Sequence, residues 1–208
     1  MIAGQDSFIM VALYEMITPV ILIGGLGTRL RSVIGNNPKG LANVSGKPFV
    51  LYLFDQLISA GFDRTTLCTG FKSEIIEETI GEVYKTLCVG YSKEVSSMGT
   101  GGALRLACRN IDSEYILLMN GDSYCNVDLR SVIEAAIFND KPCTMVVTHV
   151  DQTDRYGSVQ VSSDDHIVSF RGRDDSKGRG WINAGIYCLT RSLAMEIAPD
   201  RNQSLEHK

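Results

Sequence analysis

Residues 20–48 read VILIGGLGTRLRSVIGNNPKGLANVSGKP, and this stretch decides the fold that the sequence predicts. The aliphatic run at residues 20–23 predicts a buried strand of a parallel sheet. A glycine turn follows, and its bare backbone N–H groups can approach an anion closely; the glycines are Gly24, Gly25 and Gly27. Cations come next, at Arg29, Arg31 and Lys39. A strand, a glycine turn and cations in this order predict a phosphate-binding site.

Two better-known glycine motifs do not fit this stretch. The dinucleotide fingerprint needs a third glycine, and the chain has Leu30 at that place. The phosphate loop Gly-x4-Gly-Lys-Ser/Thr fails because Pro48 stands at the Ser/Thr position. A dinucleotide-dependent oxidoreductase is therefore disfavoured. Taken singly, Arg29 and Lys39 would be read as solvated loop cations.

The same stretch resembles the opening signature of the sugar-1-phosphate nucleotidyltransferases. That signature is Gly-Gly-x-Gly-Thr-Arg-Leu, a spacer, Pro-Lys and then Gly-Lys-Pro, and every part stands here in order. The resemblance implies that an NTP and a sugar 1-phosphate give an NDP-sugar and pyrophosphate. It implies that Arg29 binds the leaving β- and γ-phosphates and that Lys39 holds the α-phosphate or the attacking phosphate. The implied nucleotide-binding residues of this stretch are Ile23, Gly24, Gly25, Gly27 and Thr28.

The composition is that of an ordinary globular chain, with 44% apolar and 21% charged residues among 208. The net charge is −4 and the basic residues are scattered, which argues against nucleic acid as a partner. The three histidines form no metal-ligand spacing. The six cysteines form no Cys-x-x-Cys pair, so we expect buried free thiols, which suit a reducing cytoplasm.

The first fifteen residues are predicted to be a disordered or upstream extension. Their apolar run at residues 8–13 is too short to span a membrane. It also has no preceding Lys or Arg, unlike a signal peptide. Residues 16–208 are then expected to form a single nucleotidyltransferase domain without a membrane partner.

Strand and helix patterns alternate along the first 150 residues. Pro48 is expected in the first turn of a helix that Gly61 ends, Ser73 is expected to cap a second helix, and Asp128 a third. Strands are expected at residues 20–23, 65–69, 86–91, 115–119 and 143–150. This rhythm predicts an α/β protein, Rossmann-like, with three α/β/α layers around a mostly parallel sheet. A hairpin at residues 156–161 and 166–170 predicts a small antiparallel region on the acceptor side.

Two later motifs extend the resemblance on the nucleotide side. The run at residues 98–104 resembles the family's Leu-Gly-Thr-x-Gly-Ala-Leu, which contacts the base; its implied nucleotide-binding residues here are Gly99, Thr100, Gly101 and Gly102. Without the family, those glycines could form a tight turn before a helix. Asp122 follows an apolar strand, where the family places an aspartate that holds Mg²⁺, the implied cofactor. The alternative for Asp122 is an ordinary strand-end turn.

The sugar side is implied by three segments. Asn183 and Gly185 match the family's Asn-x-Gly-x-Tyr, although Gly185 could equally be a strand bulge. Tyr156 and Gly157 belong to a run that resembles small bacterial heptose 1-phosphate guanylyltransferases. Arg173 takes the position of the family's lysine and can grip a phosphate bidentately.

The chain departs from the family pattern in two places. Gly172 replaces the glutamate that often contacts the sugar, so the sequence leaves the identity of the acceptor sugar undecided. The Asp-Ile-Gly turn that usually follows Ser-Leu-Glu is absent after residues 204–206, so a second metal-ligand aspartate is missing. We therefore expect the C-terminal segment to be lacking and activity to be weak. A catalytically impaired nucleotide-binding regulator is the alternative.

Within the family, the short motifs favour GTP with manno-heptose 1-phosphate as the acceptor. Guanine offers a ring N–H and an amino group beside O6, and a site built for them rejects bases that lack them. The alternative is a hexose-1-phosphate thymidylyl-, uridylyl- or guanylyltransferase. A homodimer is compatible with the sequence, which does not give the oligomeric state.

Overall fold

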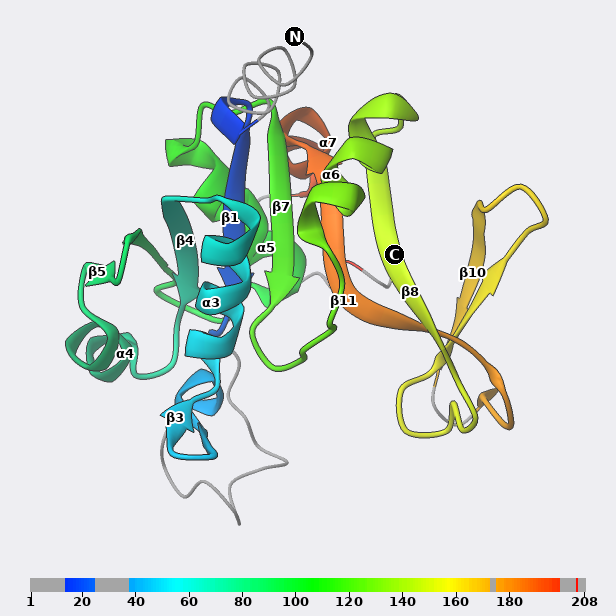
Figure 1. Cartoon of the computed structure of the whole chain (residues 1–208), viewed down its shortest axis with the longest axis horizontal. Helices are drawn as coiled ribbons and strands as arrows, with labels where there is room; N and C mark the ends of the chain where they lie inside the picture. Colours follow the sequence, from blue (N-terminus) through cyan, green and yellow to red (C-terminus); the bar gives the residue numbers. More distant parts are fainter. Residues whose placement is uncertain (1–13, 25–37, 173–174, 199–204, 206–208) are drawn as a thin grey trace, which may run out of the picture.

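The computed structural model describes residues 14–24, 38–172, 175–198 and 205. Among these residues the strands form a nine-stranded sheet in the order β10-β9-β11-β7-β1-β4-β6-β5, with β8 paired to β11. Helices cover both faces of its central part (Figure 1). The predicted α/β fold with three layers is therefore confirmed, and the sheet is mixed because antiparallel strands join both of its ends.

The four central strands are parallel and end together. β1 (Ile17–Leu22) lies between β7 (Tyr115–Asn120) and β4 (Arg64–Thr69), and β6 (Leu87–Lys93) continues the parallel order beyond β4. Leu22, the last residue of β1, is in register with Asn120 and with Cys68. The carboxyl ends of β1 and β7 therefore meet at one edge of the sheet, where ligands of such folds bind.

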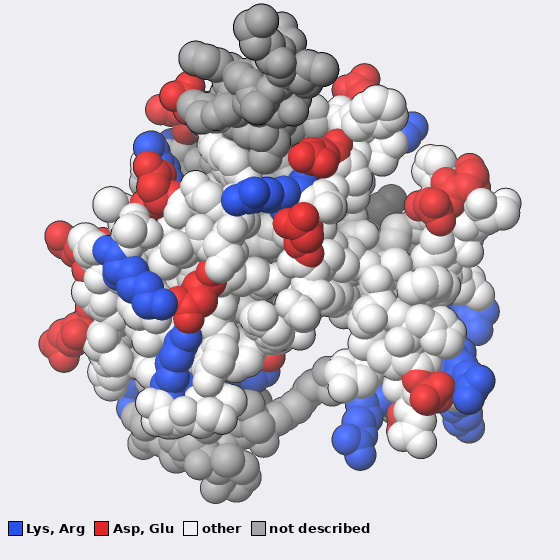
Figure 2. Space-filling model, in the orientation of Figure 1, with Lys and Arg blue, Asp and Glu red and all other residues white. Residues whose placement is uncertain are grey.

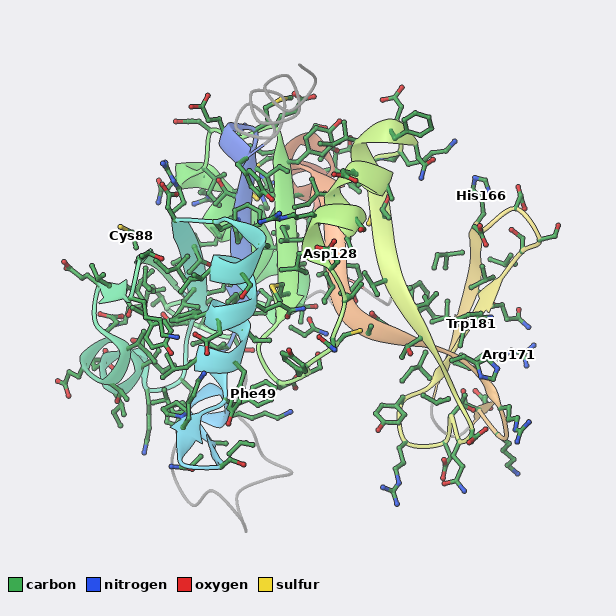
Figure 3. The ribbon with its side chains drawn as sticks, viewed as in Figure 1. Phe49, Cys88, Asp128, His166, Arg171 and Trp181 are labelled. Carbon is green, nitrogen blue, oxygen red and sulfur yellow. The ribbon has the colours of Figure 1, made fainter. Side chains whose placement is uncertain are left out.

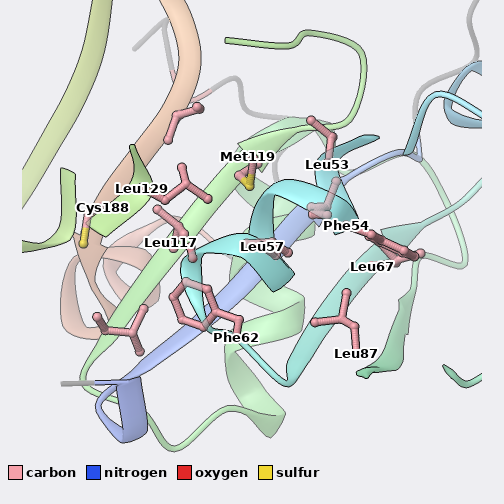
Figure 4. Close-up of a cluster of buried hydrophobic side chains, with 14 of the residues drawn as sticks. Leu53, Phe54, Leu57, Phe62, Leu67, Leu87, Leu117, Met119, Leu129 and Cys188 are labelled. Atoms are coloured by element: carbon pink, nitrogen blue, oxygen red, sulfur yellow. The ribbon is translucent and has the colours of Figure 1, made fainter. Parts of the chain in front are cut away.

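Two groups of helices bury the two faces of the sheet. One face is covered by α3 (Val50–Ala60), α4 (Ser73–Ile80) and α6 (Leu129–Phe138), whose apolar side chains form a core with the strands (Figure 4). The opposite face is covered by α5 (Gly99–Ala107) and α7 (Arg191–Glu196). β7 is almost wholly buried between these layers, as its continuous apolar sequence predicts.

The antiparallel part projects beyond the helices as an arm (Figure 1). It is made of β9 (Ser158–Val161), β10 (Ile167–Arg171) and the adjoining parts of β8 (Cys143–Val150) and β11 (Gly180–Thr190). The predicted hairpin is the β9–β10 pair. Arg171 and Trp181 lie on this arm (Figure 3). β11 pairs with β7 near its end and with β9 near its start, so one strand joins the arm to the central sheet.

Short elements complete the chain. They are the 3₁₀ helix η2 (Lys39–Leu41), the small hairpin β2 (Asn43–Val44) and β3 (Lys47–Pro48), the edge strand β5 (Val83–Tyr84), and the 3₁₀ helix η3 (Cys108–Asn110). Acidic and basic side chains are interspersed over the face shown in Figure 2. No helix in the described ranges is long and apolar enough to cross a bilayer.

Two of the three expected helix starts are wrong in detail. Pro48 belongs to β3 rather than to the first helical turn, because the small hairpin extends to it and Phe49 is the N-cap of α3. Ser73 does not cap α4: the N-cap is Lys72, and the buried Ser73 hydroxyl has no partner among the described residues. Asp128 caps α6 as predicted, since its carboxylate accepts from Arg130 N at 3.0 Å.

Tyr14 closes the core at the end of the expected extension. Its ring packs edge-on against Phe62, with 4.9 Å between ring centroids, and its hydroxyl donates to the Ala60 carbonyl. Tyr14 therefore belongs to the folded part of the chain. Residues 1–13 lie outside the described part, so the expectation for them stays a prediction.

Candidate active site

A pocket of about 240 Å³ opens at the carboxyl edge of the central strands. Five segments line it: the end of β1, the 3₁₀ helix η2, Cys68 of β4, the connection from β6 into α5, and the end of β7. The lining residues include Ile23, Gly24, Lys39, Glu94, Gly99, Thr100 and Asp122. The fold thus brings together motifs that lie a hundred residues apart in the sequence.

The ends of β1 and β7 touch closely enough to require a glycine. Gly121 N donates to Leu22 O at 2.9 Å. A Cβ at Gly121 would lie 2.6 Å from the same carbonyl and even closer to Ile23 Cγ2. The glycine before Asp122 is therefore a packing requirement, and it sets where the aspartate leaves the sheet.

Lys39 and Asp122 form an ion pair in the pocket. Lys39 comes from η2, and Asp122 from the first turn after β7. The two side chains are 32% and 45% exposed, so both can still meet a ligand. An ammonium and a carboxylate side by side can serve a phosphate oxygen and a cation respectively.

Glu94 is a pocket residue that the sequence interpretation missed. It follows β6 and anchors the start of α5, because its Oε2 accepts from Met98 N at 2.8 Å. Oε1 lies beside Gly24, where a Cβ would be only 2.9 Å away. Burial raises the pKa of the Glu94 carboxyl, against the opposing effect of the Met98 hydrogen bond. An acidic residue shortly before a glycine-rich helix start was the available signal.

The helix start of α5 divides the predicted base-binding glycines into two kinds. Gly99, with φ of 72°, and Thr100 line the pocket. Gly101 and Gly102 are buried within α5. Thr100 Oγ1 also accepts a hydrogen bond from Leu205 N at 3.0 Å, so the far end of the chain reaches this helix start.

The sugar-side residues fall into two places. Gly185 has φ of 78° at a bulge of β11, and a Cβ there would lie 2.5 Å from Ser123 Oγ, so β11 abuts the turn after β7. Asn183 Oδ1 accepts from Gly185 N at 2.8 Å and fixes that bulge. Tyr156 is exposed on the arm, and Gly157 is packed against the Arg171 carbonyl.

Five predicted site residues lie outside the described part of the chain, and their roles stay predictions. They are Gly25, Gly27, Thr28, Arg29 and Arg173.

Comparison with known proteins agrees with this geometry. The model of the nucleotidyl transferase family matches residues 18–208, and the chain belongs to that family. Two relatives are D-glycero-alpha-D-manno-heptose 1-phosphate guanylyltransferases. The one from Aneurinibacillus thermoaerophilus is 36% identical over 84% of this chain and 75% of its own. The one from Campylobacter jejuni is 33% identical over 90% of this chain and 82% of its own.

A solved structure gives the same answer for the fold. HddC from Yersinia pseudotuberculosis, complexed with GMP-PN, superimposes with a TM-score of 0.80 at 35% identity, covering 91% of this chain and 83% of that chain. The predicted resemblance to sugar-1-phosphate nucleotidyltransferases, of the heptose 1-phosphate guanylyltransferase kind, is therefore confirmed.

Proposed function

We propose that this protein joins GTP to a sugar 1-phosphate of manno-heptose type, giving a GDP-sugar and pyrophosphate. The observation that carries this proposal is the pocket in which Lys39, Asp122 and Glu94 converge from three separate segments. The names of the relatives support the guanine base and the heptose acceptor.

The reaction needs alignment and charge neutralisation more than covalent chemistry. An oxygen of the sugar phosphate attacks the α-phosphorus of the nucleotide, and the bond to pyrophosphate breaks. Lys39 can leave Asp122 and hold an oxygen of the α-phosphate or of the attacking phosphate. By its place in the motif, Arg29 is assigned to the leaving β- and γ-phosphates.

Mg²⁺ is the proposed cofactor, with Asp122 as its protein ligand. No group of three or more His, Cys, Asp or Glu side chains in the described ranges could hold a metal by itself. Mg²⁺ does not need one, because it is often bound by one or two carboxylates together with substrate phosphates and waters. The half-exposed Asp122 carboxylate, which lies beside the Lys39 ammonium, fits that manner of binding. When bound, the ion would neutralise charge on the phosphates.

Glu94 is the residue that we assign to the base. Its carboxylate can accept from the ring N–H and the 2-amino group of guanine while Oε2 keeps its bond to Met98 N. Adenine has an acceptor in place of that ring N–H, so the half-buried carboxylate would lose both donors of the base and keep only its bond from Met98 N. The predicted preference for GTP over ATP follows from this pairing.

The acceptor contacts and the cellular setting are proposed from the sequence. Asn183, Gly185, Tyr156, Gly157 and Arg173 are proposed for the sugar phosphate, with Gly172 in place of the usual glutamate. The cytoplasmic location, the absence of nucleic-acid and membrane partners, the homodimer and the single domain at residues 16–208 stay proposals from the sequence.

A matrix of four NTPs and several sugar 1-phosphates, followed by pyrophosphate release, tests the reaction. We expect turnover with GTP and a manno-configured heptose or hexose 1-phosphate. A preference for dTTP or UTP with glucose 1-phosphate would contradict the proposal and favour the hexose branch. If the protein binds GTP but releases no pyrophosphate with any combination of NTP and sugar 1-phosphate, the alternative of a catalytically impaired nucleotide-binding regulator would be favoured.

Glu94→Gln tests the base assignment, with inosine triphosphate as the probe because it lacks only the 2-amino group. An amide cannot accept from both guanine donors, so transition-state binding of GTP should weaken by about 1.5–3 kcal/mol, which lowers kcat/KM roughly 10- to 150-fold. The GTP-to-ITP ratio of kcat/KM should also shrink toward one. The matched control is Glu74→Gln, since Glu74 is exposed on α4. An unchanged ratio in Glu94→Gln would exclude this role.

A further inference from the structure

The loop of residues 121–128, here called the β7–α6 loop, is fastened to the middle of α3 by one side chain. Gln56 Nε2 donates to Cys125 O at 2.9 Å and to Val127 O at 3.0 Å. The contact joins residues about seventy positions apart in the sequence. The two carbonyls belong to the same loop as Gly121 and Asp122, which line the active-site pocket.

The chemistry of these bonds fixes the orientation of the amide. Both partners are carbonyl oxygens, so only the N–H₂ end of Gln56 can face them. Gln56 Oε1 is buried and has no partner in the described part of the chain. A buried oxygen without a partner is unfavourable, and an apolar side chain at this position would not have one. We infer that the amide is present here because its two N–H donors are needed.

The same helix is tied to the other half of the ion pair. Ala42 N donates to Lys39 O, and Phe49 N donates to Ala42 O, so the segment that carries Lys39 is bonded to the start of α3. At the far end, Arg130 of α6 donates to the carbonyls of Ser59 and Ala60. Thus α3 fixes the segment of Lys39 at its start and the β7–α6 loop in its middle.

We propose that Gln56 is a positioning residue that sets the place of Asp122 relative to Lys39, and thereby the affinity of the site for Mg²⁺. This inference rests on the proposed function, because it assigns Asp122 to the metal. Gln56 itself touches neither substrate nor metal; it acts through the backbone of the β7–α6 loop.

The test compares Gln56→Met with Ser59→Ala. Methionine keeps the length of the side chain and removes both donors, whereas Ser59 is an exposed residue one turn further along α3. In Gln56→Met, the Mg²⁺ concentration for half-maximal pyrophosphate release should rise on the order of 10-fold, as for other residues that orient a metal ligand. The midpoint of thermal unfolding shows whether each variant is folded.

Hydrogen exchange of the ligand-free protein gives a readout that does not depend on turnover. Backbone amides of residues 121–128 should exchange faster in Gln56→Met than in wild type, and Ser59→Ala should match wild type. Unchanged exchange and an unchanged Mg²⁺ titration in Gln56→Met would overturn the inference. If wild-type protein releases no pyrophosphate, the proposed function fails, and the exchange experiment alone decides whether Gln56 fastens the loop.

Gln56→Glu adds a pH profile that a purely structural role would not give. An ionised carboxylate would face two carbonyl oxygens, whereas a protonated carboxyl can donate to one of them. The rate of Gln56→Glu relative to wild type should therefore rise as pH falls. The charged groups around this position are Asp55, which pairs with Lys47 and Lys85, and Asp128 and Arg130 at the start of α6. A ratio that does not change with pH would contradict the donor role.

Discussion

Gly121→Ala should destabilise the protein and disturb the site at once. The added Cβ would lie 2.6 Å from the Leu22 carbonyl, and ordinary contacts begin near 3.4 Å. The end of β1 must therefore move away from β7, and the hydrogen bond from Gly121 N to Leu22 O must stretch from 2.9 Å. Overpacking in a well-packed site costs about 1–3 kcal/mol. Loss of the hydrogen bond adds about 0.5–1.5 kcal/mol.

The sum, about 1.5–4.5 kcal/mol, can be measured by thermal unfolding. For a chain of 208 residues each kcal/mol lowers Tm by roughly 2–4 °C, so a fall of roughly 3–18 °C is expected. Gly90→Ala is the matched control, because a Cβ at that glycine of β6 would meet only ordinary contacts at 3.7 Å or more. Its Tm should stay the same or rise slightly, since alanine restricts the unfolded chain.

Equal Tm values for Gly121→Ala and Gly90→Ala would refute the close approach of β1 and β7. The kinetic consequence is separate from stability. Gly121 precedes Asp122 directly, so Gly121→Ala should also lower the rate of pyrophosphate release at temperatures where the variant is fully folded. A destabilised variant with a wild-type rate would show that the contact serves the fold and not the site.

Three further predictions concern the site itself. Arg29→Ala should remove about 3 kcal/mol or more of transition-state stabilisation, seen as a lower kcat/KM, because a preorganised positive charge beside the leaving phosphates is lost. The urea midpoint should stay unchanged, and a near-normal kcat/KM would exclude that role. Asp122→Asn should abolish the Mg²⁺-dependent turnover while metal-free GTP binding persists, and an unchanged Mg²⁺ titration of activity would leave Asp122 as a turn residue. GTP affinity, measured by calorimetry, should fall as pH drops through the pKa of Glu94, which burial raises, because only the ionised form accepts from both guanine donors. The same pH dependence in Glu94→Gln would assign the titration to another group.

Helix and strand ends were predictable from the sequence where a local pattern is compatible with only one structure. Asp128 caps α6 as predicted, and Gly61 ends α3 with φ of 102°, which few other residues adopt. Pro48 and Ser73 misled because each residue type is common both at helix starts and just beside them. At Pro48 the small β2–β3 hairpin decides the outcome, and no helix rule includes that pairing.

Site residues that belong to a sequence motif were predictable. Site residues that only the fold brings to the pocket were not. Lys39 and Asp122 stand in motifs, and the structure brings their side chains into contact. Glu94 and Gln56 stand in no motif: the one sequence signal for Glu94 is its place shortly before a glycine-rich helix start, and a glutamine on a helix is ordinary in sequence. Their importance comes from what the sheet order places beside them, which for Glu94 is Gly24 and for Gln56 is the β7–α6 loop.

The position of β11 in the sheet bears on how the protein is made in the cell. β7 is paired with β1 on one side, but its other neighbour is β11, the last strand in the described chain. On a ribosome that adds 5–20 residues per second, the interval between the end of β7 at Asn120 and the end of β11 at Thr190 lasts about 4–14 s. During that interval an almost wholly apolar strand has an open edge that another nascent chain can pair with. Slower translation of residues 121–190 is therefore expected to lower the yield of correctly folded protein, and added chaperone to raise it.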